Sequence, residues 1–389
     1  MRSEWKSVRA GDFIEFNPRL SIKKGEVATK ISMDKLKPFT KRIPETEKVT
    51  FAGGTKFCNG DTIMARITPC LENGKTAFVD CLQDGEVGFG STEFIVLRAR
   101  DGISDPQFVY YLATSPIFRD IAIKSMVGTS GRQRVQQGVL ENLMLDVPPL
   151  TEQQEIGSFL ASLDAKIALN NKINDNLEQQ AQALFQNLFV DNARPEWKQG
   201  TICDLGAVIG GSTPSKSKPE YYTDSGIAWI TPKDLSVNKS KFIYHGENDI
   251  TELGLKNSSA SIMPEGTVLF SSRAPIGYIA IAAGEVTTNQ GFKSIVPKSE
   301  IGTAFVYYFL KYNLPMIEGM ASGSTFKEIS GSVMKSVPAF VPDSETLNVF
   351  RLFCRPLFEQ QKILELQNQS LIKLRDTLLP KLMNGEIEV

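Results

Sequence analysis

The sequence has little of what enzymes and membrane proteins usually need. It holds a single histidine, His245, and histidine is the side chain most often used in acid–base catalysis. Its five cysteines are scattered, odd in number and form no C-x-x-C pair, which disfavours a disulfide framework or a zinc site. No apolar run approaches the ~20 residues that cross a bilayer, and the N-terminus has no apolar signal-peptide core. These absences predict a non-catalytic, cytoplasmic protein without a membrane anchor.

Net charge is also nearly absent. The chain has 43 Lys and Arg against 44 Asp and Glu, a net charge of −1, which taken alone counts against nucleic acid as a partner. The distribution of charge matters more than its sum. Residues 19–48 hold nine basic side chains against four acidic ones, a local charge of +5. A solvated face and a nucleic-acid contact are both consistent with this stretch.

Residues 74–76 (Gly-Lys-Thr) end a phosphate-binding motif whose beginning is missing. The motif G-x-x-x-x-G-K-[ST] needs a glycine five residues before Gly74, and that position holds Pro69, which has no N–H to offer. The flanking stretches, 62–65 and 76–79, alternate like strands, and turn residues separate them. We therefore expect a β-hairpin here and not a nucleotide site.

The chain repeats itself. Each half begins with Trp-Lys, at residues 5 and 197, and each carries a strand after a glycine, GDTIMARITP from Gly60 and GTVLFSSRAP from Gly266. The apolar segments FVYYL (108–112) and FVYYF (305–309) also match, and from Val135 and Ile329 onward the offset is a constant 194 residues. Duplication predicts two homologous globular units, each followed by a long segment of helical character.

These long segments carry a hydrophobic repeat with a mean spacing of 3.5 residues, which is typical of a coiled-coil seam. An ordinary helical hairpin within a larger core is the alternative. The linker allows parallel or antiparallel pairing, and the asparagines at 170, 174 and 368 are candidates for fixing the register. The predicted seam residues are Ile156, Leu160, Leu163, Ile167, Asn174, Leu177 and Leu184, with Leu357, Leu364, Asn368, Leu371 and Leu378 on the second helix.

Four stretches are distinctive: the two helical segments after Val-Pro-Pro (147–149) and Val-Pro-Asp (341–343), the run GGSTPSKSKPEYY…GIAWITPKDL (210–235) and the terminal LRDTLLPKLMNGEI (374–387). Together they resemble the specificity (S) subunits of Type I restriction-modification systems. ITPCLENGKTAFV (67–79) is similar to one branch of the family's recognition domains. The resemblance covers essentially the whole chain. It implies a mixed α/β (α+β) fold with two pseudo-symmetric globular target recognition domains, joined by a long antiparallel two-helix coiled coil.

The boundaries that follow are 1–149 for the first recognition domain, 150–190 for the central helix, 191–343 for the second domain and 344–389 for the C-terminal helix. The resemblance implies double-stranded DNA as a partner, together with two modification (M) methyltransferase subunits and restriction (R) motor-nuclease subunits. It implies that S-adenosylmethionine, ATP and Mg serve those partners, so no cofactor is expected on this chain. A coiled-coil adapter with two protein-binding heads and no DNA is the alternative function.

Candidate DNA contacts are polar loop residues, because phosphates and base edges are bound by Lys, Arg, Ser, Thr, Asn, Gln and loop N–H groups. Solvent-exposed turn chemistry is the alternative for each loop, and residues 289–291 (Asn-Gln-Gly) are ambiguous between a structural turn and a contact. In the first domain the candidates are Lys23, Lys24, Lys56, Arg66, Thr68, Thr129, Ser130, Arg132, Gln133 and Arg134. In the second they are Ser212, Thr213, Ser215, Lys216, Thr231, Lys233, Ser272, Arg273, Ser324, Thr325 and Lys327.

Overall fold

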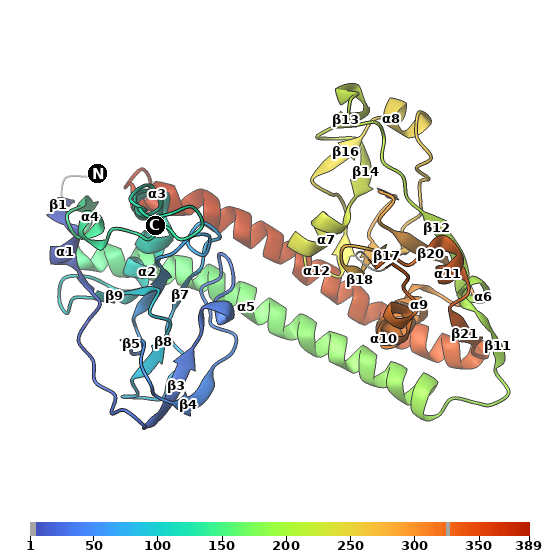
Figure 1. Ribbon diagram of the computed structural model, residues 1–389, viewed down its shortest axis with the longest axis horizontal. Coiled ribbons are helices and arrows are strands. Elements are labelled where there is room, and N and C mark those ends of the chain that lie inside the picture. Colours follow the sequence, from blue (N-terminus) through green and yellow to red (C-terminus); the bar gives the residue numbers. More distant parts are fainter. Residues whose placement is uncertain (1–4, 324–326) are drawn as a thin grey trace. The chain divides into compact units, whose positions relative to one another are not determined.

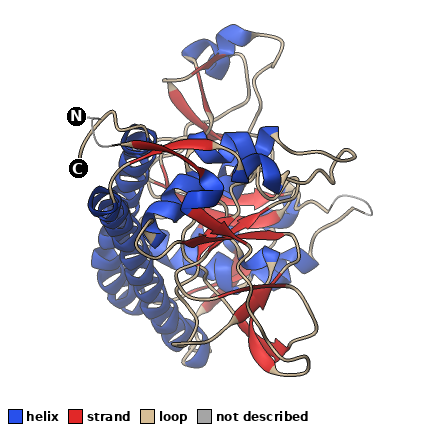
Figure 2. Ribbon diagram, turned by 90° about the vertical axis from the view of Figure 1, so that its left-hand side faces the viewer, coloured by secondary structure: helices blue, strands red, loops and turns tan. Residues whose placement is uncertain are grey.

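A computed structural model describes residues 5–323 and 327–389 of the chain. It divides into two compact units (Figure 1): unit 1 comprises Met1–Leu169 and Gln369–Val389, and unit 2 comprises Asn170–Asn368. Two long helices, α5 (Leu150–Gln186) and α12 (Ser344–Met383), each contribute to both units. Short helices and strands, distinguished by colour in Figure 2, make up the remainder of each unit.

Unit 1 contains three small sheets, with strand orders β1-β10, β2-β9-β6-β7 and β4-β3-β8-β5. Its strands are β1 (Lys6–Arg9), β2 (Ile14–Phe16), β3 (Val27–Ile31), β4 (Glu47–Thr50), β5 (Thr55–Phe57), β6 (Thr62–Ala65), β7 (Thr76–Phe78), β8 (Gly88–Gly90), β9 (Phe94–Ala99) and β10 (Met144–Val147). Its short helices are α1 (Ala10–Phe13), α2 (Pro106–Thr114), α3 (Pro116–Lys124) and α4 (Gln137–Glu141).

Unit 2 is built in the same way, from sheets β11-β21, β12-β20-β17-β18-β15 and β13-β16-β14-β19. Its strands are β11 (Lys198–Thr201), β12 (Gly206–Gly210), β13 (Tyr222–Thr223), β14 (Ile227–Ile230), β15 (Phe242–Ile243), β16 (Asn248–Ile250), β17 (Val268–Ser272), β18 (Ile276–Ala282), β19 (Thr287–Thr288), β20 (Lys293–Pro297) and β21 (Pro338–Val341). Its short helices are α6 (Ile202–Leu205), α7 (Pro232–Val237), α8 (Glu252–Lys256), α9 (Thr303–Tyr312), α10 (Leu314–Gly319) and α11 (Gly331–Lys335).

The internal repeat predicted from the sequence is confirmed in the pairing of strands. The antiparallel hairpin β6–β7 corresponds to β17–β18, and the parallel pair β3–β8 corresponds to β14–β19. The apolar helices α2 and α9 also correspond, and each buries Phe, Val, two Tyr and two further apolar residues. The mixed α/β architecture is confirmed as well.

The Gly-Lys-Thr tripeptide lies where the hairpin prediction places it. Thr76 begins β7, which pairs with β6, and Gly74 has a φ of +71° in the turn between them. A side chain at this glycine would meet the Phe39 ring at 2.6 Å. The Lys75 ammonium donates a hydrogen bond to the Met33 carbonyl at 2.9 Å, so it is engaged within the fold.

The helices α5 and α12 run antiparallel wherever they meet (Figure 1). In unit 2 the Asn170 amide donates to Asn368 Oδ1 at 2.9 Å, and Gln361 donates to the Asn174 carbonyl at 3.2 Å, so ascending numbers on α5 face descending numbers on α12. In unit 1 the Arg375 guanidinium donates to Asp164 at 2.7 Å. The antiparallel pairing implied by the family resemblance is confirmed.

All twelve predicted seam residues are buried or half-buried. Between the apolar positions, Asn170, Asn171 and Asn368 form a polar layer, in which the Asn368 amide donates to Asn171 Oδ1 at 2.8 Å. Asn170 Oδ1 and Asn174 Oδ1 are buried without a hydrogen-bond partner among the described residues. Polar groups left unpaired in this way cost stability and favour a single register.

In unit 1, a cluster that we call the first latch ties the globular part to the helices; it consists of Lys41, Tyr111, Asp164 and Arg375. The Tyr111 hydroxyl donates to Asp164 on α5 at 2.6 Å, and Arg375 on α12 donates to the same carboxylate. Lys41 Nζ lies 4.7 Å from the centre of the Tyr111 ring and donates to its hydroxyl oxygen at 3.2 Å. Burial lowers the pKa of Lys41 to about 8 against the pull of nearby carboxylates.

The second latch holds the equivalent place in unit 2 and consists of Lys241, Tyr308, Glu178 and Lys311. Glu178 on α5 accepts hydrogen bonds from the Tyr308 hydroxyl at 2.8 Å, from Lys241 at 2.7 Å and from Lys311 at 2.6 Å. Burial opposes ionisation of Glu178, but the two ammonium groups outweigh it and lower its pKa to about 2. Lys241 is 8% exposed, and burial lowers its pKa to about 8.

Candidate nucleic-acid interface

Each unit has a loop cluster with the same backbone hydrogen-bonding pattern, which we call the frame. In unit 1 the frame is formed by the turn 91–93 after β8, and in unit 2 by the turn 289–291 after β19. Ser91 Oγ accepts from the Glu93 N–H at 3.1 Å, and Asn289 Oδ1 accepts from the Gly291 N–H at 2.9 Å. Each turn accepts a hydrogen bond from the end of a neighbouring strand. The N–H of Arg66, which follows β6, donates to the Glu93 carbonyl, and the N–H of Ser272, which ends β17, donates to the Gly291 carbonyl.

In unit 1 this frame brings four predicted contact residues together: Arg66, Thr68, Gln133 and Arg134. The Thr68 hydroxyl exchanges hydrogen bonds with the backbone of Gln133, at 3.1 Å as donor and 2.9 Å as acceptor. The Arg134 guanidinium donates three hydrogen bonds of 2.7 to 3.0 Å to the Glu93 carboxylate. This contact lowers the pKa of Glu93, so the carboxylate is firmly ionised and Arg134 is neutralised in the free chain.

An open cleft of about 520 Å³ lies beside this cluster. Among the described residues that line it, three are basic, Arg19, Lys56 and Arg66, and none is acidic. Lys56 Nζ also lies 5.3 Å from the centre of the Phe51 ring. A wall of this composition suits a polyanion. The ten lining residues are Asn17, Pro18, Arg19, Leu20, Gly54, Thr55, Lys56, Arg66, Thr92 and Phe94.

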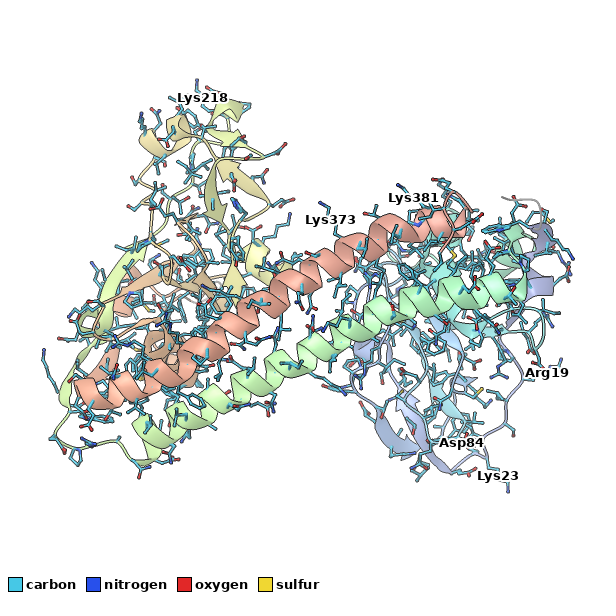
Figure 3. The ribbon with its side chains drawn as sticks, turned by 180° about the vertical axis from the view of Figure 1, so that it is seen from behind. Arg19, Lys23, Asp84, Lys218, Lys373 and Lys381 are labelled. Atoms are coloured by element: carbon cyan, nitrogen blue, oxygen red, sulfur yellow. The ribbon has the colours of Figure 1, made fainter. Side chains whose placement is uncertain are left out.

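The other candidates of unit 1 lie outside the cleft. Thr129, Ser130 and Arg132 are exposed on the loop that leads to Gln133 and Arg134. Lys23 and Lys24 are exposed on the connection between β2 and β3, and Figure 3 shows Lys23 pointing away from the body of the unit. The structure therefore gathers Lys56 and Arg66 into one site and leaves the Lys23–Lys24 pair apart from it.

In unit 2 several predicted residues surround the turn 289–291. The Ser212 N–H donates to the Thr288 carbonyl at 2.8 Å, and the Thr213 hydroxyl donates to the Gln290 side chain. Ser272 is fully buried, and its hydroxyl donates to the Gly291 carbonyl at 3.1 Å, so its role in this structure is to hold the turn. The Thr231 hydroxyl is likewise engaged, because it donates to Asp234 at the start of α7.

Basic side chains of unit 2 lie at the same cluster and on exposed loops. Arg273 is 3.6 Å from Glu328, a looser ion pair than that of Arg134 in unit 1. Lys233 pairs with Glu247 at 2.6 Å, while Ser215, Lys216 and Lys327 are exposed. The candidates Ser324 and Thr325 lie outside the described residues. All these assignments to DNA contact stay predictions.

Sequence reasoning missed several members of these clusters. Arg19 is part of the basic stretch, and the structure places it in the cleft two residues after Asn17, which has a φ of +49°. Lys293 was also missed; it donates to the Gln290 carbonyl at 3.3 Å and lies near Glu328. The ambiguous turn 289–291 is structural through Asn289 and Gly291, while Gln290 receives the Thr213 contact.

Two kinds of site are absent from the part of the chain that the structure describes. Within residues 5–323 and 327–389, no three His, Cys, Asp or Glu side chains are grouped so that they could hold a metal ion. A search of the same residues finds no helix with the length and apolar character needed to span a membrane.

Comparison with known proteins defines the class. The family model described as "Type I restriction modification DNA specificity domain" matches residues 2–179 and 195–378, and the chain belongs to this family. The family resemblance seen in the sequence is thereby confirmed. A DNA specificity domain matched twice supports DNA recognition over the adapter alternative.

Particular relatives agree with this assignment. The chain is 27% identical over 407 residues to the Type I restriction enzyme HindI specificity subunit of Haemophilus influenzae, a match covering 84% of this chain and 86% of that protein. A stretch of 163 residues is 42% identical to the MjaIX specificity subunit of Methanocaldococcus jannaschii, covering 41% and 38% of the two chains. The solved Type-I restriction-modification S subunit from M. genitalium aligns over 97% of this chain and 96% of its own, with a TM-score of 0.57 at 17% identity, which is a likeness of fold.

Proposed function

We propose that this chain is the non-catalytic, DNA-reading subunit of a cytoplasmic Type I restriction-modification complex. Each unit contacts one half of a two-part DNA site. The observation that carries the proposal is the repeated frame at turns 91–93 and 289–291, which occurs once in each of the two family segments. A frame used twice provides two similar contact surfaces on one chain.

The proposed site is asymmetric because the side chains on the two frames differ. Unit 1 carries Arg66 where unit 2 carries Ser272, and it carries Arg134 where unit 2 carries Glu328. Sequence is read by side chains at base edges, so two different sets select two different half-sites. The helix pair α5–α12, which contributes to both units, sets the unread spacer between the half-sites.

The catalytic partners are proposed to be two M subunits, which bind S-adenosylmethionine, and R subunits, which use ATP and Mg. Apolar side chains on the outer side of α12 offer a docking surface for the M subunits. Val349, Leu352 and Ile363 are 51%, 59% and 49% exposed, beside a fully formed inner seam. Because several basic side chains are already ion-paired and the net charge is −1, the chain alone should bind DNA weakly.

The test is to map N6-methyladenine across the genome in cells that hold the cognate M subunit with this chain, and in cells that lack the chain. Methylation of one asymmetric two-part motif that depends on the chain is the expected result. An active M subunit whose methylation pattern is the same with and without the chain would overturn the proposal and favour the adapter.

A further inference from the structure

We propose that Arg66 is a specificity-determining residue that recognises a guanine in the half-site contacted by unit 1. This inference rests on the proposed function and goes beyond it, because it assigns one base to one side chain. The starting observation is that the backbone of Arg66 is fixed by hydrogen bonds, whereas its buried Nε donates to no partner among the described residues.

The backbone of Arg66 is fixed from both sides. Its N–H donates to the Glu93 carbonyl at 2.9 Å, and its carbonyl accepts from the Val135 N–H at 2.8 Å. Arg66 directly follows the buried strand β6, so its Cα has little freedom to move. A side chain that must select one base among four benefits from such a rigid base.

The side chain of Arg66, in contrast, forms no hydrogen bond or ion pair with the residues that the structure describes. Its Nε atom is buried, and no described residue accepts a hydrogen bond from it. Glu93 lies near enough for the Arg66 charge to contribute to its lowered pKa, but the Glu93 oxygens are hydrogen-bonded to Arg134. A buried donor without an acceptor is costly, so the Arg66 side chain is not placed to make a contact within the fold.

The cleft around Arg66 indicates what the ligand is. Arg19 and Lys56 line the same cleft, and no carboxylate does, which favours the sugar–phosphate backbone at the outer basic groups. Gly54, which also lines the cleft, lets two backbone segments pack closely: its φ is +123°, and a Cβ there would lie 2.2 Å from the Gly90 carbonyl oxygen. This wall of the cleft is therefore held in place by close backbone packing.

The donor geometry of Arg66 then selects the base. A guanidinium offers two parallel N–H groups, and guanine alone presents two acceptors, O6 and N7, side by side in the major groove. Arg19 is exposed and Lys56 lies against the Phe51 ring, so we assign these two to phosphates. The equivalent position in unit 2 is Ser272, which is buried and bonded to the turn, so unit 2 lacks this contact.

The first experiment compares methylation motifs directed by the wild-type chain, Arg66→Ala and Arg66→Lys, each with the cognate M subunit. Arg66→Ala should relax a guanine at one position of one half-site, by on the order of 5- to 150-fold in selectivity, and leave the other half-site unchanged. Arg66→Lys keeps the positive charge but loses the two parallel N–H donors, so it should reduce the selectivity for guanine at the same position. Arg9→Ala, which removes an exposed arginine paired with Asp12 outside the cleft, is the matched control and should keep the wild-type motif.

The second experiment places 7-deazaguanine, which lacks the N7 acceptor, at the mapped guanine in a synthetic duplex. Binding by the wild-type complex should fall at least about fivefold, and binding by the Arg66→Ala complex should not change. A uniform loss of affinity on all sequences would make Arg66 a phosphate contact and overturn the inference. So would an unchanged motif. If the wild-type chain directed no motif at all, the proposed function itself would fail, which is a separate outcome.

Discussion

The first and second latches solve one structural problem with different charges. Both bury a tyrosine from the equivalent helices α2 and α9, both stack a lysine on it, and both direct its hydroxyl to a carboxylate on α5. In unit 1 the carboxylate is balanced by Arg375 from α12, and in unit 2 by Lys241 and Lys311 from the globular part. The duplicated chain has conserved the tyrosine–carboxylate bond and changed the source of the positive charge.

The contact surfaces show the opposite pattern. Their backbone frame is kept, while the side chains that it carries are changed, as in Arg66 against Ser272. Charge at the latches serves to hold each unit on its helices, so any arrangement that balances the carboxylate will do. In the proposed function, charge at the contact surface faces DNA, so its arrangement determines which sequence is bound. The divergence between the units is what this proposal expects of two surfaces that recognise different half-sites.

The largest expected effect comes from breaking the second latch. Glu178→Gln leaves Lys241 buried without its carboxylate and should lower the free energy of unfolding by about 3 to 5 kcal/mol. Asp164→Asn should cost about 1 to 3 kcal/mol, because Arg375 keeps Asp376 as a partner at 2.8 Å. Urea unfolding of both variants measures the difference. If Asp164→Asn lowered the free energy of unfolding as much as Glu178→Gln, the proposed difference between the two latches would be contradicted.

The second latch also predicts a pH dependence. The pKa of Glu178 in the folded chain is about 2, below its ordinary value of 4.5, so its contribution is complete above pH 4.5 and is lost as the pH falls toward 2. The stability gap between the wild-type chain and Glu178→Gln should narrow by about 3 kcal/mol over this range. Unfolding free energies measured at intervals below pH 5 test it, and a gap that stays constant would remove Glu178 from this role.

Much of this architecture could be predicted from sequence because it depends on short-range patterns. The 3.5-residue spacing identified the stripe that includes Leu160 and Leu364, and Pro69 was enough to exclude a nucleotide loop. The latches could not be predicted in this way. Lys41 and Asp164 are far apart in the chain, and a lysine beside other charged residues has the same appearance whether it is buried or exposed.

The DNA contacts stay predictions, and the side-chain partners of the candidate loops could not be predicted, for a related reason. Loops rich in Ser, Thr, Lys and Arg were identified, but composition does not show which hydroxyls are already used. The Thr231 hydroxyl donates a hydrogen bond to Asp234, and the Ser272 hydroxyl donates one to the Gly291 carbonyl. Arg19 lines the cleft beside Asn17, a position that depends on the tertiary path of the chain. The side-chain partners of these loop residues depend on tertiary structure and leave no periodic signal in the sequence.

Neighbouring residues on α12 offer a comparison between the inner and outer faces of one helix. Leu364 is 4% exposed and Ile363 is 49% exposed. Leu364→Ala should lower the free energy of unfolding by about 2 to 3 kcal/mol, whereas Ile363→Ala should change it by less than about 0.5 kcal/mol. Thermal unfolding of the chain measures both. Weaker capture of the M subunit by Ile363→Ala, at unchanged stability, would support the proposed docking surface.

The smallest expected effect concerns two arginines on the contact surfaces. Arg134 is held by three hydrogen bonds to Glu93, whereas Arg273 is 3.6 Å from Glu328 and can exchange that acid for a phosphate more easily. Arg273→Gln should therefore make the salt dependence of DNA binding by the assembled complex shallower by about 0.9 in logarithmic slope, with an affinity loss that is similar on all sequences. Arg134→Gln should change the slope less, because its charge is already balanced. Titrations of a site-containing and a scrambled duplex at several salt concentrations separate the two variants. If Arg134→Gln gave the larger change, the tightness of the ion pair in the free chain would not govern which arginine reaches the phosphates.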